Sequence, residues 1–189
     1  MKDGVRALGV AESFRGTEST LAGAVVRASR VADGFVFGTC TVGGRDATET
    51  VCEMVDRLDR EDVRYVLLAG IAPAWYNFLD LPVIAERVDR PVLSVTFEAS
   101  EGLESALCEA FEGDELDERL ALYRRQPERR ALVVNDDTVF VRATGIDEEE
   151  AAAVVRAFTP EGGRPEPLRV ARLAARAADD RFVSGRDQG

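Results

Sequence analysis

The first 42 residues of the chain contain strand-like segments and no helix-like one, which limits the fold more than any other feature of the sequence. Short β-type runs, at Val5–Val10, Leu21–Ala28 and Phe35–Val42, are separated by the stretches "RGTEST" and "ADG". This order predicts two consecutive antiparallel hairpins. A doubly wound α/β fold would instead open with a β-α-β unit, so the strand-only start argues against that class.

Helical and extended segments alternate after the hairpins. In "DATETVCEMVDRLDR" the apolar residues fall on one helical face, with Asp46 as the expected N-cap and Glu49 completing a capping box. A buried strand over Val63–Leu68 follows, then a short helix capped by Asp80, and then a strand over Pro91–Phe97. Three antiparallel strands followed by this β-α-β-α-β series predict a ribonuclease H-like mixed sheet.

The rest of the chain is mostly helical. A helix over Leu103–Phe111 is expected, with Ser100 as its cap and Gly113 at its end. The further predicted elements are a helix over Glu115–Arg125, a hairpin turning near Asn135-Asp136, a helix over Asp147–Phe158 and a final helix over Leu168–Ala178. We expect one domain over residues 1–183 and a frayed tail over residues 184–189.

The charge of the chain indicates adaptation to salt. The net charge is −11, and Lys2 is the only lysine among 24 basic residues. Crowded carboxylates repel little at molar salt, where the Debye length is only ~3 Å, so a halophilic archaeal cytoplasm fits this composition. No apolar run approaches a signal peptide or the ~20 residues of a membrane span, which predicts a cytoplasmic protein with no membrane partner. In a salt-rich cell counterion release contributes little affinity, so the acidity does not exclude nucleic-acid binding.

The absence of histidine removes several kinds of chemistry. It rules out Ser-His and Cys-His nucleophile pairs and His-rich metal sites. Cys40, Cys52 and Cys108 are odd in number and widely spaced, so they are expected to be reduced core residues. No Walker loop or GxGxxG motif is present. Carboxylates at strand ends remain, and in phosphodiester hydrolysis such groups hold divalent cations. The strand end in "VLLAGIAP", however, offers only the methyl group of Ala69.

Four stretches resemble, in order and spacing, the motifs of the archaeal endonuclease dU family: "GVRALGVAESFR", "CTVGGRDAT", "VLLAGIAPAWYNFLDLPVIAE" and "RPEPLRVARLAAR". The resemblance spans most of the chain and implies a fold similar to that of endonuclease V. It also implies a DNA endonuclease that acts at deoxyuridine or other damaged bases, with Mg²⁺ (or Mn²⁺) as cofactor and damaged DNA as partner.

The chain departs from the family pattern at several charged positions. Ala11-Glu12 stand where the family carries Asp-Asp, and Gly43 stands where the family carries the aspartate of Val-Asp-Gly. Ala69 replaces the aspartate after the central strand, and Arg172 replaces a histidine in the last motif. The resemblance therefore implies the scaffold of a nuclease site in which neutral or cationic groups have replaced several charged ones.

Glu12 and Asp46 are the candidate catalytic residues and metal ligands. Glu12 occupies the place of the second family aspartate, and Asp46 matches a later one. Each also has a structural interpretation, because Glu12 can be a solvated strand-end side chain and Asp46 a helix cap. Asp80, Glu98 and Asp137 are further carboxylates that could supply missing ligands.

Substrate-binding candidates come from two segments. Trp75, Tyr76 and Asn77 could stack on or hydrogen-bond a displaced base, or they could cover the edge of the core. The final segment holds the one concentrated positive feature of the sequence, made by Arg164, Arg169, Arg172 and Arg176. These arginines would meet a phosphate backbone if the last helix borders the site, or they could pair with surface carboxylates. Glu166 and Arg169 of "PEPLR" are expected to form an ion pair.

Two functional classes follow from the sequence. The first is a metal-dependent DNA endonuclease for deaminated bases, with Glu12 and Asp46 as the remaining ligands. The second is a catalytically inactive relative that binds nucleic acid or a protein partner on the same scaffold. Retained arginines together with lost metal ligands are what the second class would show.

Overall fold

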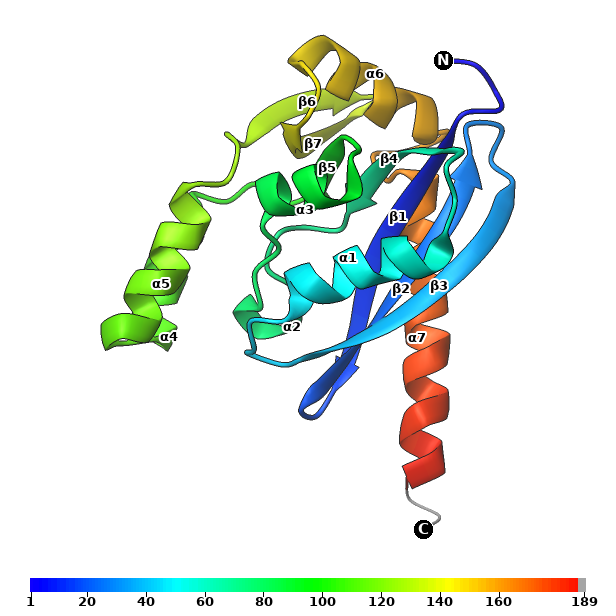
Figure 1. Ribbon diagram of the computed structural model, residues 1–189. Helices are drawn as coiled ribbons and strands as arrows, with labels where there is room; N and C mark the ends of the chain where they lie inside the picture. The colour runs from blue at the N-terminus through cyan, green and yellow to red at the C-terminus, as the bar shows by residue number, and fades with distance from the viewer. Residues whose placement is uncertain (187–189) are drawn as a thin grey trace.

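The computed structural model describes the backbone of residues 1–186 and the side chains of residues 1–180 (Figure 1). The strands are β1 (Arg6–Arg15), β2 (Glu18–Arg27), β3 (Ala32–Thr41), β4 (Val63–Leu68), β5 (Val92–Thr96), β6 (Arg130–Val134) and β7 (Asp137–Thr144). The helices are α1 (Ala47–Leu58), α2 (Pro73–Tyr76), α3 (Leu81–Val88), α4 (Glu104–Ala110), α5 (Gly113–Arg124), α6 (Glu148–Phe158) and α7 (Glu166–Arg186).

All seven of these strands form one mixed sheet in the order β3-β2-β1-β4-β5-β7-β6. The first three strands pair antiparallel, as the two predicted hairpins require. β4 and β5 join in parallel, because α1 and α3 carry the chain back across one face between strands. The β6–β7 hairpin then adds antiparallel to β5. The predicted mixed sheet is therefore confirmed.

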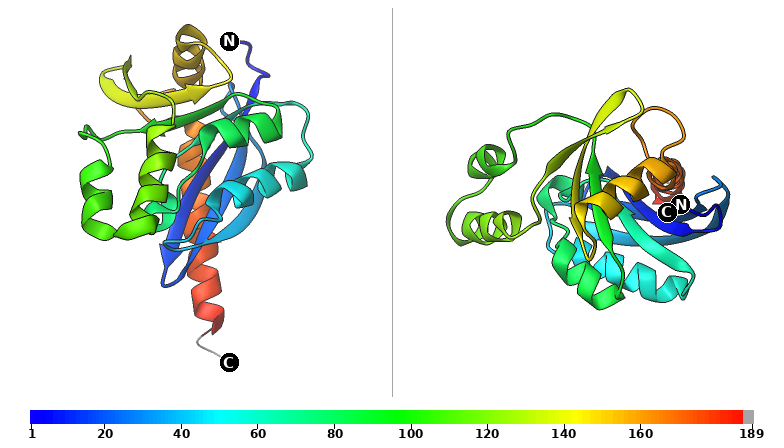
Figure 2. Two further views of the ribbon diagram at one scale, coloured as in Figure 1. Left: turned by 60° about the vertical axis from the view of Figure 1, so that its left-hand side comes forward. Right: turned by 90° about the horizontal axis from the view of Figure 1, so that it is seen from above.

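Alternate residues of β1 face opposite layers of the molecule. Leu8 and Val10 point into the core beneath α1 and α3, whereas Ala7 and Ala11 point to the side that α6 and α7 cover. In Figures 1 and 2 the sheet separates α7 from α1 and α3. α7 lies so close to β1 that a Cβ on Gly9 would be 2.3 Å from the carbonyl carbon of Pro167. The two faces of the sheet thus form separate environments.

Some predicted boundaries were wrong. α4 begins at Glu104 with Leu103 at its N-cap, not at Ser100. Glu49 pairs with Arg87 of α3 and does not close a capping box. α7 continues to Arg186, three residues into the segment for which fraying was predicted, and residues 187–189 lie outside the described part of the chain.

Two helix caps depend on distant side chains. Asp46 and Asp80 stand at the N-caps of α1 and α3 as predicted, but neither side chain caps its helix. Instead, Asn77 Oδ1 accepts a 3.0 Å hydrogen bond from the first amide of α1, and Gln126 Oε1 accepts one of 3.0 Å from the first amide of α3. The side-chain amide nitrogens of the same two residues donate to the aspartates: Asn77 Nδ2 to Asp46 at 2.6 Å and Gln126 Nε2 to Asp80 at 3.3 Å. Each aspartate therefore orients the residue that caps the helix.

The cysteines agree only partly with the prediction. Cys40 and Cys52 are buried and free, but Cys108 is exposed on α4. Burial raises the pKa of the Cys40 thiol to about 12, with further contributions from Asp46 and Glu12. Within the described residues, no helix has the length and apolarity needed to span a membrane.

Candidate nucleic-acid interface

A groove of about 530 Å³ lies where the carboxyl ends of β4 and β5 meet α7. Its walls include Ala69 after β4, Phe97 and Glu98 after β5, and a series of arginines on and before α7. We call it the arginine groove and define it by Ala69, Thr96, Phe97, Glu98, Arg164, Leu168, Arg169, Arg172, Leu173 and Arg176. Carboxyl ends of strands in open α/β sheets are a usual place for ligand binding.

The arginines of this groove differ in what they contact. Arg169 donates two hydrogen bonds to Glu166, at 2.7 and 2.6 Å, and this contact holds the pKa of Glu166 below its usual range. The predicted ion pair is therefore present. Arg164 lies 4.2 Å above the Phe97 ring. Among the described side chains, Arg164, Arg172 and Arg176 have no carboxylate within ion-pair distance. These charges are left to attract an external anion.

Alanine side chains form the floor beside this groove. Ala11 of β1 packs in one cluster with Ala24, Val26 and Ala171, and Ala69 packs against the same cluster. The resemblance to the endonuclease dU motifs implied two aspartates and a histidine at the positions of Ala11, Ala69 and Arg172. The fold thus brings these positions together, but here they offer methyl groups and a guanidinium.

Glu12 lies on the other face of the sheet from Ala69. As the neighbour of Ala11 on β1, it points toward α2, where one carboxylate oxygen accepts hydrogen bonds from the Ala74 amide (2.7 Å) and from Ser19 Oγ (3.0 Å). Its side chain is half-buried and joins β1 to β2 and to the loop after β4. Glu12 therefore has a structural role that neither sequence interpretation included.

Asp46 is held just as firmly. It accepts hydrogen bonds from the Thr41 amide at 3.0 and 3.1 Å, from Thr41 Oγ1 at 2.9 Å and from Asn77 Nδ2 at 2.6 Å. Burial alone would raise the pKa of Asp46, but the hydrogen bonds from Asn77 and Thr41 outweigh it, and the pKa lies below its ordinary value. The Asp46 carboxylate thus binds the backbone amide and the hydroxyl of Thr41, the last residue of the edge strand β3.

The two predicted metal ligands thus share one face but do not face the arginine groove. Both bond to the segment around α2, and both contribute to the raised pKa of the Cys40 thiol. No group of three or more Asp, Glu, Cys or His side chains suited to a metal ion exists among residues 1–180. One carboxylate oxygen of Glu12 and both oxygens of Asp46 accept hydrogen bonds from protein donors, and no third ligand joins them, so the described residues do not fit a divalent ion held by several carboxylates.

The three further carboxylates that could have supplied missing metal ligands lie in different parts of the fold. Asp80 is buried and paired with Arg125 and Gln126. Asp137 begins β7 and lies against Gly163, outside the arginine groove. Glu98 does line the groove, as the prediction for strand ends allows. It is the one acidic side chain among the residues that define the groove.

The aromatic loop lies on the Glu12 face. Ala74, Trp75 and Tyr76 all have left-handed backbone angles, with φ of 47°, 54° and 63°. Trp75 is 52% exposed and packs against Phe111 with the two rings tilted and their centroids 5.1 Å apart. Asn77 has no exposed surface, and both ends of its amide are bonded, so it has no free group to offer a base. The predicted Trp75–Asn77 set is therefore separated by the sheet from the predicted arginines.

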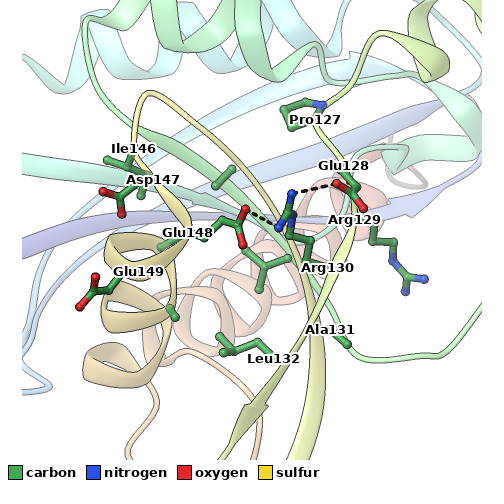
Figure 3. A pocket seen from close by; sticks show the side chains of 14 residues that line it. Pro127, Glu128, Arg129, Arg130, Ala131, Leu132, Ile146, Asp147, Glu148 and Glu149 are labelled. Atoms are coloured by element: carbon green, nitrogen blue, oxygen red, sulfur yellow. Dashed lines mark hydrogen bonds and ion pairs between the residues drawn. The ribbon is translucent and has the colours of Figure 1, made fainter.

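Figure 3 shows a second hollow, of about 790 Å³, between β6 and α6. Arg130 lies there between Glu128 and Glu148 and pairs with both, while Arg129 points the other way. Neighbouring carboxylates thus neutralise Arg130, in contrast to Arg164, Arg172 and Arg176 of the arginine groove.

Sequence reasoning missed Thr96 and Phe97 as groove residues. Functional side chains are expected at the carboxyl ends of parallel strands, and this expectation was applied only to Ala69 at the end of β4. Thr96 and Phe97 lie at the carboxyl end of β5, the parallel strand next to β4. A search of every strand end, not only the one in "VLLAGIAP", would have found them.

Comparison with known proteins identifies the family. The sequence model described as Endonuclease dU matches residues 3–179. This chain belongs to the endonuclease dU family. Similar proteins include the UPF0215 protein of Pyrobaculum calidifontis, 33% identical over 172 residues that cover 89% of this chain and 93% of that one. A UPF0215 protein of Thermococcus kodakarensis is 34% identical over 162 residues, 85% of this chain and 81% of the relative.

Solved structures show the same fold. A protein of unknown function from Archaeoglobus fulgidus is 25% identical, with a TM-score of 0.81, over 92% of this chain and 97% of that one. Human endonuclease V is 13% identical, with a TM-score of 0.65, over 94% of this chain and 85% of its own. Endonuclease V of Ciona intestinalis, solved with DNA containing an inosine, is 11% identical with a TM-score of 0.61, over 94% and 87%. This endonuclease dU family member has the ribonuclease H-like sheet of endonuclease V.

Proposed function

We propose that this chain recognises DNA containing deoxyuridine or another deaminated base and holds its phosphate backbone in the arginine groove. Membership of the endonuclease dU family and the endonuclease V fold support a nuclease function. The observation that carries the DNA-binding part is the set Arg164, Arg172 and Arg176, for which no carboxylate partner exists among the described side chains. In a chain of net charge −11, such a cluster at strand ends favours a polyanionic ligand.

Metal-dependent cleavage has less support from the side chains than DNA binding has. Family descent would place carboxylates at Ala11 and Ala69, and this chain packs methyl groups there. Glu12 and Asp46 remain the proposed ligands, and their common contact with the α2 segment is in favour of a shared site. Both already accept hydrogen bonds from the protein, however, so we derive no cleavage step through a metal. The alanine floor favours a family member that binds damaged DNA without cutting it efficiently.

The test compares binding and cleavage on matched duplexes. Duplexes that carry deoxyuridine, deoxyinosine or no lesion are incubated with the protein and Mg²⁺ or Mn²⁺ at several potassium chloride concentrations. Fluorescence anisotropy measures binding, and denaturing gels measure strand scission. We expect binding that Arg172→Gln weakens and little or no scission.

Two outcomes would replace this proposal. Lesion-specific scission that disappears in both Glu12→Gln and Asp46→Asn would establish a working endonuclease with the ligands that the sequence predicted. Lack of binding to any duplex under every condition would instead leave a protein partner as the function. Circular dichroism of each variant checks that the fold is intact.

A further inference from the structure

A pocket of about 310 Å³ lies on the opposite face of β5 from the arginine groove. The turn after β4, the strands β5 and β7, and Tyr123 of α5 surround it. Thr96 and Glu98 line both this pocket and the arginine groove, so the two hollows adjoin at the end of β5. Its volume is at the lower end of the range for small-molecule sites, roughly 300–1,000 Å³, and admits one small ligand.

Arg129 enters this pocket from the segment before β6. Its guanidinium donates to neutral acceptors only: the Glu98 carbonyl at 2.6 Å, Thr96 Oγ1 at 3.1 Å, and the Ser100 carbonyl at 3.1 Å. It also lies 4.0 Å above the Phe140 ring. These contacts fix the orientation of the cation without neutralising it.

Arg142 of β7 supplies a second cation. It donates to the Pro127 carbonyl and, at 3.4 Å, to the Tyr123 hydroxyl, and it lies 5.4 Å from the Tyr123 ring. Neither arginine has an ion pair among the described side chains. Both arginines line the same pocket, and burial and then the charge of Arg142 lower the pKa of Arg129.

Two adjacent, half-buried cations without a counter-charge are costly unless an anion joins them. The chain has 35 acidic residues and 24 basic ones, so a carboxylate partner would be easy to provide. Yet the pocket has only Glu98 on its rim, and that side chain pairs with neither arginine. The hydroxyls of Ser94, Ser100 and Tyr123 add neutral donors around the same space.

We propose that this pocket is a phosphate-binding site in which Arg129 and Arg142 hold the oxyanion and the surrounding hydroxyls complete its hydrogen bonds. Guanidinium forks match phosphate oxygens, and charge-assisted bonds of this kind are the stronger class of hydrogen bond. A phosphate has more oxygens to satisfy than a carboxylate, which suits a pocket that combines two arginines with several hydroxyl donors. The site goes beyond the proposed function, because it lies across the sheet edge from the arginine groove.

Isothermal titration calorimetry with inorganic phosphate tests the site directly. Ionic strength is held constant with potassium chloride, so that a nonspecific anion effect appears equally in the chloride blank. We expect saturable binding of one phosphate, weakened at least tenfold by Arg142→Gln and partly restored by Arg142→Lys. Arg172→Gln, which alters the arginine groove, should leave the phosphate affinity unchanged.

Two further titrations identify the source of the phosphate. Deoxyuridine monophosphate represents a free nucleotide, and an oligonucleotide with a 5′-phosphate, compared with its 5′-hydroxyl form, represents a DNA end. Tighter binding of the phosphorylated oligonucleotide that Arg142→Gln abolishes would assign a DNA end, and equal binding of both oligonucleotides would assign a free phosphate or nucleotide.

Absence of phosphate binding above the chloride blank, or equal affinity in a folded Arg142→Gln variant, would overturn the proposal. Because Arg172→Gln tests DNA binding separately, such a failure is distinguishable from a failure of the proposed function.

Discussion

The carboxylate of Glu12 accepts a 2.7 Å hydrogen bond from the backbone amide of Ala74, the first of three consecutive residues with left-handed backbone angles. Such angles in residues with a Cβ cost of order 1–3 kcal/mol each and persist only where surrounding contacts hold them. Gly43 leaves room for the Trp75 ring, since a Cβ there would lie 2.8 Å from it. Glu12 is thus one of the groups that hold Trp75 in its exposed position.

Replacing Glu12 should therefore destabilise the protein before it affects any chemistry. Glu12→Ala leaves the Ala74 amide without its acceptor and the Ser19 hydroxyl with only the Ser13 carbonyl at 3.4 Å, at an expected cost of about 1–3 kcal/mol in the free energy of unfolding. Glu12→Gln keeps an acceptor oxygen and should cost less than about 1 kcal/mol. Urea unfolding at fixed potassium chloride, followed by circular dichroism, measures both values.

Glu86→Ala is the matched control, because Glu86 is exposed on α3 and should change stability by no more than ~0.5 kcal/mol. If Glu12→Gln lowers the free energy of unfolding as much as Glu12→Ala does, the negative charge of Glu12 matters more than its hydrogen bonds. The hydrogen bonds from Ala74 and Ser19 would then not be what makes Glu12 stabilising.

The lowered pKa of Asp46 predicts how the free energy of unfolding depends on pH in the acid range. Its pKa in the folded protein lies below the ordinary value of ~3.9, so the unfolded chain takes up this proton first as pH falls. The stability that Asp46 contributes is complete above about pH 4 and is lost as pH falls through the folded pKa. Asp46→Asn, which can still accept from Asn77 and Thr41, should therefore flatten the decline in unfolding free energy below about pH 4.

Denaturant unfolding at a series of pH values measures this slope, and Glu86→Gln is the control. Other carboxylates with lowered pKa values, including Asp33 and Glu166, contribute the slope that remains. An Asp46→Asn profile that parallels the wild type would show that the bonds from Asn77 and Thr41 do not favour the charged form.

The sheet could be predicted from the sequence because its signals are local, whereas the site could not. Hairpin spacing and one-sided apolar patterns lie within single elements. The face of Glu12 depends on strand alternation, which sends neighbours such as Ala11 and Glu12 to opposite sides of the sheet. The sequence comparison treated Ala11 and Glu12 as one motif at the end of a strand, and so it did not separate the two faces to which they point.

The helix caps show the same limit in another form. Asp46 has the sequence position of an N-cap, and its side chain instead bonds to Asn77, which lies 31 residues along the chain. The choice between two acceptors for the first amide of α1 is made by tertiary contact, so no local pattern around Asp46 could have revealed it.

Arginines of the groove should control the salt dependence of DNA binding. Each phosphate contact removed should lower the slope of log affinity against log salt by about 0.9. Arg172→Gln and Arg176→Gln should each show this change with any duplex, because phosphate contacts carry no sequence information. Anisotropy titrations across a potassium chloride series measure the slope.

Arg130→Gln is the matched arginine control, since Arg130 is already paired with Glu128 and Glu148 beside α6. A slope that falls equally in Arg130→Gln and Arg172→Gln would indicate binding spread over the surface rather than in the groove.

Substitutions of Ala69 test whether the phosphate backbone of the DNA lies in the arginine groove. Ala69→Asp would add a carboxylate beside Arg172 and reduce the positive charge of the groove. DNA affinity should therefore fall several-fold without added metal, whereas the neutral and similarly sized Ala69→Asn should bind within about twofold of the wild type. Equal effects of the two substitutions would point to a steric cause, and no effect of either would place the DNA elsewhere.

The net charge of −11 predicts that stability increases with salt. The Debye length falls from ~10 Å at 0.1 M to ~3 Å at 1 M, which removes most repulsion among surface carboxylates. Screening also weakens surface ion pairs, but exposed pairs contribute only ~0–1 kcal/mol each.

The triple variant Glu53→Gln, Glu86→Gln and Asp117→Asn removes three exposed acids that have no ion pair among the described side chains. Its melting temperature should exceed that of the wild type at 0.1 M potassium chloride, and the difference should shrink by 3 M. Because salt acts on burial equally in both proteins, this shrinking difference isolates repulsion, and a constant difference would refute it.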